Sequence, residues 1–348
     1  MLVLGGSLYH RGGLESFCER AAAAIGLHAP GWDAEWRPTD NASLTPARVP
    51  GAMRRLAGLV RARGRFDLVW LQWSTLTDLA FLHAARLIGL RVMVTPHLGA
   101  NARLQRVDRL RGLCRRLLGA ADGIALLYPG QGAEVALPIA VPQVTIRTFL
   151  PMQSLSPPAA SVRSGPLRLV HAGRLSEAKG ALRTIELCAL LAARGIACEA
   201  QIVGRGDAAL LARMRQAIAG AGLERQVTLT PWLAPEALGR ALAEADVLAH
   251  LSLLDAFPLI VLEALAAGAL PVVGEMAGAA SMVAAYDGHV APGSSAAAAA
   301  DWLASVPPAA LRQRGAAAAA RVRADYDWAA CADQAVRAAE AVLTVSRR

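Results

Sequence analysis

Short, continuously apolar runs alternate with longer segments of helical period along this chain, and that alternation restricts the fold more than any other feature. DLVWLQW at 67–73, for example, precedes a helical segment at 77–89, and another apolar run, RVMVTPH, follows at 91–97. Strands that are buried on both faces read as continuous apolar runs, whereas strands with one wet face alternate apolar and polar residues. The pattern therefore predicts an α/β fold of parallel sheets covered by helices on both faces.

The same periodicity predicts the positions of the individual strands and helices. Strands are predicted at 2–4, 67–73, 91–97, 123–129, 144–149, 167–173, 197–204, 226–232, 247–252 and 269–274. Helices are predicted at 14–25, 77–89, 102–118, 180–193, 208–220, 235–244, 258–267 and 326–343. The Ala-rich stretches at 296–300 and 316–320 are good helix material as well.

One segment, PMQSLSPPAASVRSGP at 151–166, separates two series of strands and helices. It is rich in Pro and Ser and shows no period, which is typical of a linker. A chain of 348 residues also suits two domains better than one. We therefore predict a Rossmann-like domain at 1–150, a linker at 151–166, a second Rossmann-like domain at 167–325 and a C-terminal helical segment at 326–348.

The formal net charge of +9 favours anionic partners. The sequence contains no RNA-binding signature, zinc-finger spacing or basic stripe interleaved with aromatic residues, so no nucleic-acid partner is expected. Phosphorylated ligands and an anionic membrane surface remain. Five scattered cysteines without a C-x-x-C pair predict free thiols in a reducing compartment. The strand-like start MLVLGG leaves no room for a signal peptide, so we expect a cytoplasmic protein.

A single lysine, Lys179, stands among the 36 Lys and Arg residues of the chain, in the segment HAGRLSEAKG at 171–180. Arg174 precedes it by five residues, directly after the strand predicted at 167–173. Open parallel sheets bind their ligands at the carboxyl ends of the strands. A guanidinium fork and a compact ammonium suit a diphosphate at that place. The alternative is a solvated turn with incidental charges, but the retention of one lysine favours a ligand.

Two carboxylates follow the strand predicted at 247–252. Asp255 lies just before the helix that Pro258 is expected to open at its first position, and Glu263 lies inside that otherwise apolar helix. The amino end of such a helix attracts anions. Asp255 as a plain helix cap and Glu263 as a solvated side chain are the structural alternatives. A buried carboxylate needs partners, however, and vicinal hydroxyls of a ligand would satisfy Glu263.

These segments together resemble a known family. DAFPLIVLEALAAGALPVV at 255–273 is similar to the E-x7-E signature of retaining nucleotide-sugar glycosyltransferases of the GT-B fold, family 4. HAGRLSEAKG resembles the G-R-L-x-x-E-K-G segment of that family, IVGRG at 202–206 its I-V-G-x-G, and HRGGLESFCERAA at 10–22 its G-G entry segment. The similarity covers most of the chain in the order of the family.

The resemblance implies a GT-B fold with two Rossmann-like domains facing across a cleft and a C-terminal helix that crosses back to the N-terminal domain. It implies an enzyme that moves a hexose from a nucleotide diphosphate sugar to a hydroxyl of a glycan or lipid-linked acceptor, with retention and without a metal, in bacterial envelope or exopolysaccharide assembly. The first domain would bind the acceptor and the second the donor. The nucleotide sugar would be a co-substrate, and no cofactor is expected.

The family pattern also implies roles for individual residues. Those implied at the reaction centre are His97, Asp255, Arg174 and Lys179. Those implied to bind the donor are Gly12, Gly13, Arg174, Lys179, Gly204, Gly206, Asp255, Phe257, Pro258, Leu259 and Glu263. Arg174 and Lys179 would neutralise the diphosphate, Glu263 would accept from the ribose hydroxyls, and Asp255 would hold a hydroxyl of the transferred sugar.

The glycines and the first loop complete the implied site. Gly12 and Gly13 would let the backbone approach the diphosphate, while Gly204 and Gly206 would shape the pocket of the base. Residues 9–11, Tyr-His-Arg, are further candidates for contact with acceptor or phosphate. A histidine such as His97 at the end of a buried strand is also often structural.

The sequence departs from the family pattern at several positions. The first acidic residue is Asp255 instead of Glu, Pro258 replaces the commoner Gly and removes an amide donor, and Met282 stands where many members carry Glu. No D-x-D metal motif is present, in line with the metal-independent chemistry that is typical of the fold.

Four alternatives to a glycosyltransferase stay open. They are a donor-binding pseudoenzyme, a sugar-nucleotide epimerase of the same fold, a phosphorylase whose pyridoxal cofactor would need Lys179, and an NAD-dependent oxidoreductase. The GGSLYHRGG loop does not favour the oxidoreductase.

The segment at 102–118, ARLQRVDRLRGLCRRLL, places arginines and leucines at helical spacing. A basic amphipathic helix is typical of proteins that bind an anionic membrane surface. An ordinary surface helix with a buried leucine stripe is an equal alternative. Membrane binding would favour a lipid-linked acceptor and a peripheral location on the inner face of the cytoplasmic membrane.

Overall fold

The computed structural model describes residues 1–9, 12–41, 49–158 and 165–344. It divides into two compact units, of which unit 1 comprises Met1–Leu150 with Tyr326–Arg348 and unit 2 comprises Pro151–Asp325. Each unit is built on one six-stranded sheet whose strand pairs are all parallel, so the predicted α/β fold with two Rossmann-like halves is confirmed.

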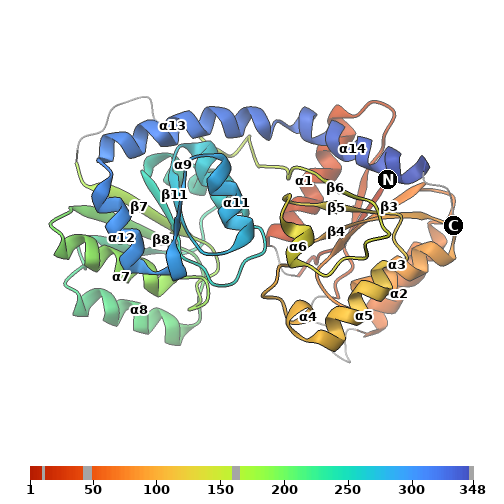
Figure 1. Ribbon diagram of the computed structural model, residues 1–348, viewed down its shortest axis with the longest axis horizontal. Helices are drawn as coiled ribbons and strands as arrows, with labels where there is room; N and C mark the ends of the chain where they lie inside the picture. Colours follow the sequence, from red (N-terminus) through yellow and green to blue (C-terminus); the bar gives the residue numbers. More distant parts are fainter. Residues whose placement is uncertain (10–11, 42–48, 159–164, 345–348) are drawn as a thin grey trace. The chain divides into compact units, whose positions relative to one another are not determined.

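The sheet of unit 1 has the order β2-β1-β3-β4-β5-β6. Its strands are β1 (Leu2–Leu4), β2 (Glu35–Arg37), β3 (Leu68–Trp73), β4 (Arg91–Pro96), β5 (Gly123–Leu126) and β6 (Gln143–Thr145). The helices are α1 (Gly13–His28), α2 (Val49–Arg61), α3 (Asp78–Leu87), α4 (Arg103–Arg106), α5 (Asp108–Leu118), α6 (Gln131–Glu134) and α14 (Trp328–Thr344). Figure 1 shows α1 and α14 on one face of this sheet and α2, α3 and α5 on the other.

The sheet of unit 2 has the order β12-β11-β10-β7-β8-β9. Its strands are β7 (Leu167–Ala172), β8 (Cys198–Val203), β9 (Val227–Thr230), β10 (Val247–His250), β11 (Leu270–Gly274) and β12 (His289–Ala291). The helices are α7 (Ala181–Ala193), α8 (Ala208–Gly220), α9 (Pro235–Glu244), α10 (Leu259–Ala267), α11 (Ala277–Ala285), the 3-10 turn η2 (Pro292–Ser294), α12 (Ala296–Ser305) and α13 (Pro308–Asp325). Helices α7, α8 and α12 cover one face, and α9, α10, α11 and α13 lie over the other (Figure 1).

The last helix, α14, belongs to unit 1 and packs on α1 and β4. Trp328 Nε1 donates to the Leu150 carbonyl at 2.6 Å, and Gln334 Nε2 donates to the Thr145 carbonyl at 3.1 Å. Gly123 on β5 lies so close to this helix that a Cβ atom would sit 2.5 Å from Val342 Cγ2. The α14 helix therefore closes one face of the first sheet.

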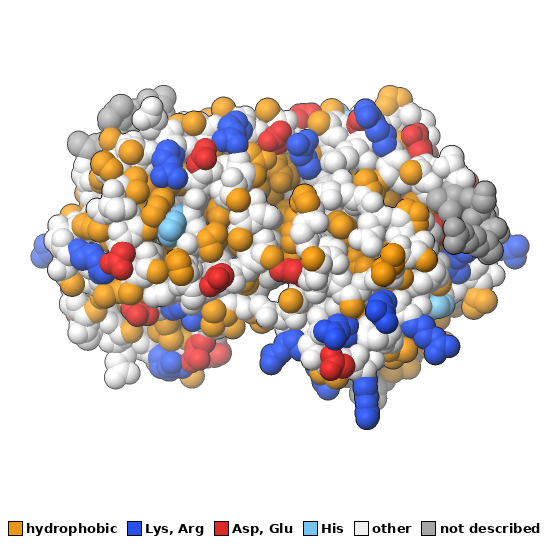
Figure 2. Space-filling view, in the orientation of Figure 1, with side chains coloured by type: hydrophobic (Ala, Val, Ile, Leu, Met, Phe, Trp, Pro, Cys, Tyr) orange, Lys and Arg blue, Asp and Glu red, His pale blue; other side chains and the backbone are white. Residues whose placement is uncertain are grey.

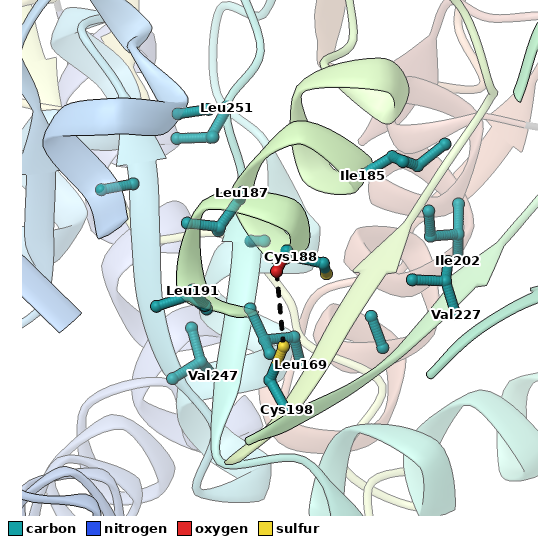
Figure 3. Close-up of a cluster of buried hydrophobic side chains, with 14 of the residues drawn as sticks. Leu169, Ile185, Leu187, Cys188, Leu191, Cys198, Ile202, Val227, Val247 and Leu251 are labelled. Carbon is teal, nitrogen blue, oxygen red and sulfur yellow. Dashed lines mark hydrogen bonds between the residues drawn. The ribbon is translucent and has the colours of Figure 1, made fainter. Parts of the chain in front are cut away.

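The core of unit 2 is a cluster of buried aliphatic side chains between α7 and the strands β7, β8 and β10 (Figure 3). Cys188 on α7 and Cys198 on β8 lie inside it, and the Cys198 Sγ atom is 3.9 Å from the Cys188 carbonyl oxygen. All five cysteines of the chain are buried and free. Because this cluster fixes α7 against the sheet, it also fixes the loop of residues 173–180 that leads into α7.

Two details of the expected helices were wrong. The single helix expected at 102–118 is two helices, α4 and α5, because Val107 between them has an extended backbone (φ −96°, ψ 110°). The buried side chain of Gln105 accepts a hydrogen bond from the Ala136 amide at 2.9 Å, which ties α4 to the segment after α6. Pro258 caps α10 with an extended backbone (φ −74°, ψ 101°), so the helix begins at Leu259 and not at the proline.

Candidate active site

The loops after β10, β7 and β8 are neighbours, because β7 lies between the other two strands in the sheet of unit 2. Hydrogen bonds join the first two loops directly. The Leu253 amide donates to the Ala178 carbonyl at 2.7 Å, and Arg183 Nε on α7 donates to the Leu251 carbonyl at 2.8 Å. Gly180, with a positive φ of 85°, caps α7 where a Cβ atom would lie 2.5 Å from the Leu251 carbonyl oxygen. These contacts bring Lys179 and Asp255 together across 76 residues of sequence.

Lys179 and Asp255 form an ion pair between the Lys179 ammonium and Asp255 Oδ1. Both side chains are mostly buried, with 22% and 15% of their surfaces exposed. The second oxygen, Asp255 Oδ2, lies 3.0 Å from His250 Nε2 at the end of β10. Burial alone would raise the pKa of Asp255, but the hydrogen bond from His250 and the charge of Lys179 lower it to about 2. Asp255 is therefore a carboxylate with a partner on each oxygen.

His250 and His171 were not among the residues predicted from the sequence. The two rings stack at 6.4 Å between centroids, with 16° between their planes. His171 Nδ1 lies 2.9 Å from the Ala249 carbonyl oxygen, and burial lowers the pKa of His171 to about 4. The only hint in the sequence is a histidine in the otherwise apolar run VLAHLS, five residues before Asp255.

Arg174 differs from Lys179, although both lie on the loop between β7 and α7. Its side chain is exposed, and it makes no hydrogen bond or ion pair with any other residue that the structure describes. One cation of this loop is thus held inside the protein while the other faces solvent, where an anionic ligand can reach it.

The remaining donor-binding candidates from the acidic motif surround the start of α10. Pro258 is buried, whereas Phe257 and Leu259 are half-buried. Glu263 is half-buried on a helix whose neighbouring side chains, Leu262 and Ala264, are completely buried. Met282, where the family pattern has Glu, is buried on α11.

Gly204 and Gly206 follow β8 and lie against the loop after β7. A Cβ atom on Gly204 would be 1.9 Å from the Gly173 carbonyl oxygen, and one on Gly206 would be 3.0 Å from Leu175 Cβ. The Leu175 amide also donates to the Arg205 carbonyl at 2.8 Å. In unit 2 these glycines let two strand-end loops touch, which holds Arg174 at the carboxyl edge of the sheet.

In unit 1, Gly12 and Gly13 lie at the start of α1, and the Glu15 side chain binds backbone amides of the loop before them. The Glu15 carboxylate accepts from the Ser7 amide at 3.0 Å and from the Gly12 amide at 2.9 Å. The Gly12 amide is therefore paired within the protein. Tyr9 is exposed, while His10 and Arg11 lie outside the described residues.

His97 follows β4 in the same unit. Its ring packs edge-to-face with the ring of Phe17, and the two ring centroids are 5.1 Å apart. Its Nε2 atom lies 2.9 Å from Gln72 Oε1, and Gln72 Nε2 donates to the Trp70 carbonyl at 3.2 Å. Because the amide oxygen of Gln72 faces the ring, Nε2 must carry the hydrogen and Nδ1 keeps its lone pair. Burial lowers the pKa of His97 to about 3, so the ring is a neutral acceptor at Nδ1 near neutral pH.

A basic surface covers α4 and α5, where Figure 2 shows arginine side chains gathered. Its exposed arginines are Arg103, Arg106, Arg109, Arg111, Arg115 and Arg116. Two large apolar side chains are also exposed on this surface, Val107 between the two helices at 42% and Leu113 on α5 at 41%. Among the helices of the described residues, none is both long enough and apolar enough to span a bilayer.

Each unit is an α/β fold on a parallel sheet, with candidate residues on the loops that follow its strands. Two such units in one chain are the architecture of the GT-B glycosyltransferases. The family model of the glycosyl transferases group 1 matches residues 156–312, which make up most of unit 2. The resemblance deduced from the sequence is confirmed at that level.

Two curated relatives match parts of the chain. The amylovoran biosynthesis glycosyltransferase AmsK of Erwinia amylovora is 39% identical over 114 residues, which cover 31% of this chain and 27% of AmsK. The D-inositol 3-phosphate glycosyltransferase of Arthrobacter sp. (strain FB24) is 28% identical over 259 residues, or 69% of this chain and 61% of that protein. The matches thus span less than two thirds of either relative.

Solved structures match almost the whole chain. Sucrose-phosphate synthase from Thermosynechococcus elongatus superposes with a TM-score of 0.80 and 18% identity, covering 99% of both chains. Anabaena HepE in complex with UDP and glucose gives a TM-score of 0.75 and 16% identity, covering 97% of this chain and 99% of HepE. At such identities the likeness establishes the fold.

Proposed function

We propose that this chain is a retaining glycosyltransferase that moves a hexose from a nucleoside diphosphate sugar to a hydroxyl of a glycan or lipid-linked acceptor. The proposal includes a role in the assembly of envelope or exopolysaccharide and chemistry without a metal or cofactor. Its main support is one arrangement in unit 2, where a solvent-facing guanidinium, a partly buried ammonium and the amino end of α10 come from adjacent strand-end loops.

This arrangement suits a leaving diphosphate. The bond between the anomeric carbon and the phosphate oxygen breaks, and negative charge develops on the diphosphate. Cations and helix dipoles that already point at this charge stabilise it without reorganisation. The acceptor oxygen bonds to the anomeric carbon on the same face, and its proton passes to the departing phosphate oxygen. Arg174, Lys179 and the α10 amides are the groups that we assign to this step.

The other implied residues have matching chemistry. We assign Glu263 to the ribose hydroxyls, Asp255 to a hydroxyl of the sugar, and the loop around Gly204 and Gly206 to the base. In unit 1, which we assign to the acceptor, the lone pair of His97 Nδ1 suits a hydroxyl donor from the substrate. HepE was solved with UDP and glucose bound, and AmsK is a glycosyltransferase of amylovoran biosynthesis, which makes UDP the first nucleotide to test.

Nucleotide binding is expected to depend on Arg174. A ligand at 100 times its Kd stabilises a protein by about 2.7 kcal/mol, so one of UDP, GDP or ADP should raise the Tm by roughly 5–10 °C. Arg174→Ala removes a charged hydrogen-bonding group and should weaken that nucleotide about 10- to 100-fold in calorimetry.

Arg215→Ala is the matched control, since Arg215 is an exposed arginine on α8 of the same unit. It should bind the nucleotide as the wild type does. Binding with no transfer or hydrolysis of any donor would indicate a pseudoenzyme, and a change in the sugar of the free nucleotide donor would indicate an epimerase. No binding of any nucleotide would remove the proposed function.

We also propose that the basic surface of α4 and α5 docks on an anionic membrane. Six exposed arginines and the exposed side chains of Val107 and Leu113 provide charge and apolar contact for such a surface. This location would give the enzyme access to a lipid-linked acceptor.

Reversal of two of these charges tests the docking. Each basic residue near an anionic bilayer contributes about 1 kcal/mol, so Arg109→Glu with Arg116→Glu should lower partitioning at least about 30-fold in vesicle flotation. Arg215→Glu with Arg225→Glu changes the net charge equally but lies in unit 2 and should float like the wild type. Equal losses in both pairs, or equal flotation with neutral vesicles, would contradict the assignment.

A further inference from the structure

The Asp255 carboxylate is held by two side chains from two neighbouring strands and their loops. Lys179 on the loop after β7 binds Oδ1, and His250 at the end of β10 contacts Oδ2 at 3.0 Å. His171 on β7 stacks behind His250. These are the charged and titratable groups that act on Asp255 among the described residues.

The hydrogen on His250 can be placed by its partner. A carboxylate only accepts hydrogen bonds, so the Nε2 atom that faces Asp255 Oδ2 must be the donor. The other ring nitrogen, Nδ1, is buried and has no partner among the described residues. His250 therefore serves as a directed N–H donor whose contact is the Asp255 side chain.

This donor matters because Asp255 is one methylene shorter than the Glu of the family pattern. Each carboxylate oxygen can accept two hydrogen bonds, so Lys179 and His250 leave a lone pair on each oxygen for a ligand. They also offset a negative charge that would otherwise repel a nearby diphosphate. Without His250, the carboxylate would keep one partner and would be able to rotate about it.

We infer that His250 is a positioning residue, which fixes the plane of the Asp255 carboxylate so that its free lone pairs meet the hydroxyls of the transferred sugar. The inference rests on the proposed function and adds to it a residue outside the family motif. His250 acts through Asp255 and takes no part in the bond changes itself.

Two substitutions separate positioning from packing. His250→Leu removes the donor but keeps an apolar side chain in the buried site, whereas His250→Gln keeps an N–H donor near the position of Nε2. We expect His250→Leu to lower kcat for donor turnover about 10- to 100-fold, and His250→Gln to restore most of it. His171→Leu removes an equally buried imidazole that makes no hydrogen bond to Asp255, and it should retain turnover.

The titration of Asp255 gives a second readout. The hydrogen bond favours the ionised carboxylate, so its loss raises the pKa of Asp255. In His250→Leu the carboxylate then takes up its proton at a higher pH, and the acid limb of kcat/KM moves to higher pH. Carboxyl ¹³C NMR of aspartate-labelled protein, with Asp255→Asn to assign the resonance, measures the same shift without any substrate.

The outcomes are distinct. A higher midpoint in His250→Leu, with wild-type behaviour in His250→Gln and His171→Leu, supports the inference. An unchanged midpoint, or equal loss of turnover in His250→Leu and His250→Gln, overturns it while the proposed function stands. A wild-type protein that binds no nucleoside diphosphate overturns the proposed function instead.

Discussion

Lys179→Ala is expected to lower donor turnover about 100- to 1,000-fold, the usual cost of removing one group that stabilises a developing oxyanion. The side chain is a compact cation on the loop after β7, and the diphosphate would lose its nearest ammonium. Lys179→Arg should not restore turnover, because a planar guanidinium cannot replace a point charge in a mostly buried position. Steady-state kinetics measures both variants, with sugar donors of whichever nucleotide the wild type binds.

The ion pair with Asp255 offers a second explanation for such a loss, and a double-mutant cycle separates the two. If Lys179 serves only to neutralise Asp255, then Lys179→Ala should have no further effect in an Asp255→Asn background. If it acts on the diphosphate, the loss of about 100-fold or more should persist there. Near-wild-type turnover of the single variant would refute the diphosphate assignment.

Gly204→Ala is expected to destabilise unit 2 by about 3–5 kcal/mol, at the upper end for single substitutions. The new Cβ atom would overlap the Gly173 carbonyl oxygen, and that oxygen belongs to the backbone and cannot swing aside. For a domain of this size the Tm should fall by roughly 10 °C or more in calorimetry. Nucleotide binding should weaken as well, because the loop that carries Arg174 would move.

Gly220→Ala provides the comparison for that experiment. Gly220 is the last residue of α8, and a Cβ atom there would meet nothing within 4 Å. Its Tm should equal or exceed that of the wild type, since Ala favours a helix over Gly. A Tm of Gly204→Ala close to that of Gly220→Ala would show that the two strand-end loops can separate at little cost.

The parts of the fold that the sequence predicts well are those whose burial decides their structure. Strand β3, LVWLQW, is buried at all six positions and is apolar except for Gln72, so its burial on both faces shows in the sequence. Strand β2, Glu35–Arg37, is a polar edge strand and carries no such signal. Helix α2 was missed for a similar reason, since Pro50, Gly51 and several arginines interrupt its pattern while only Leu59 is buried.

The candidate site was predictable only in part for a different reason. Motif positions place Arg174, Lys179 and Asp255 after their strands, but they do not tell which side chains pair. That Lys179 and His250 share the two oxygens of Asp255 follows from β7 and β10 being neighbours, which is a property of the sheet order. The contact of Gln105, the residue two positions before the break at Val107, is likewise with a residue remote in sequence, Ala136.

The position of α14 has a consequence for biosynthesis. Because this helix is synthesised after all of unit 2, the face of the first sheet that α1 covers lacks the contacts of α14 until then. Unit 1 therefore cannot complete its fold until the whole of unit 2 has been synthesised. A nascent chain halted before Trp328 would leave the apolar surface of α1 and β4 available to chaperones.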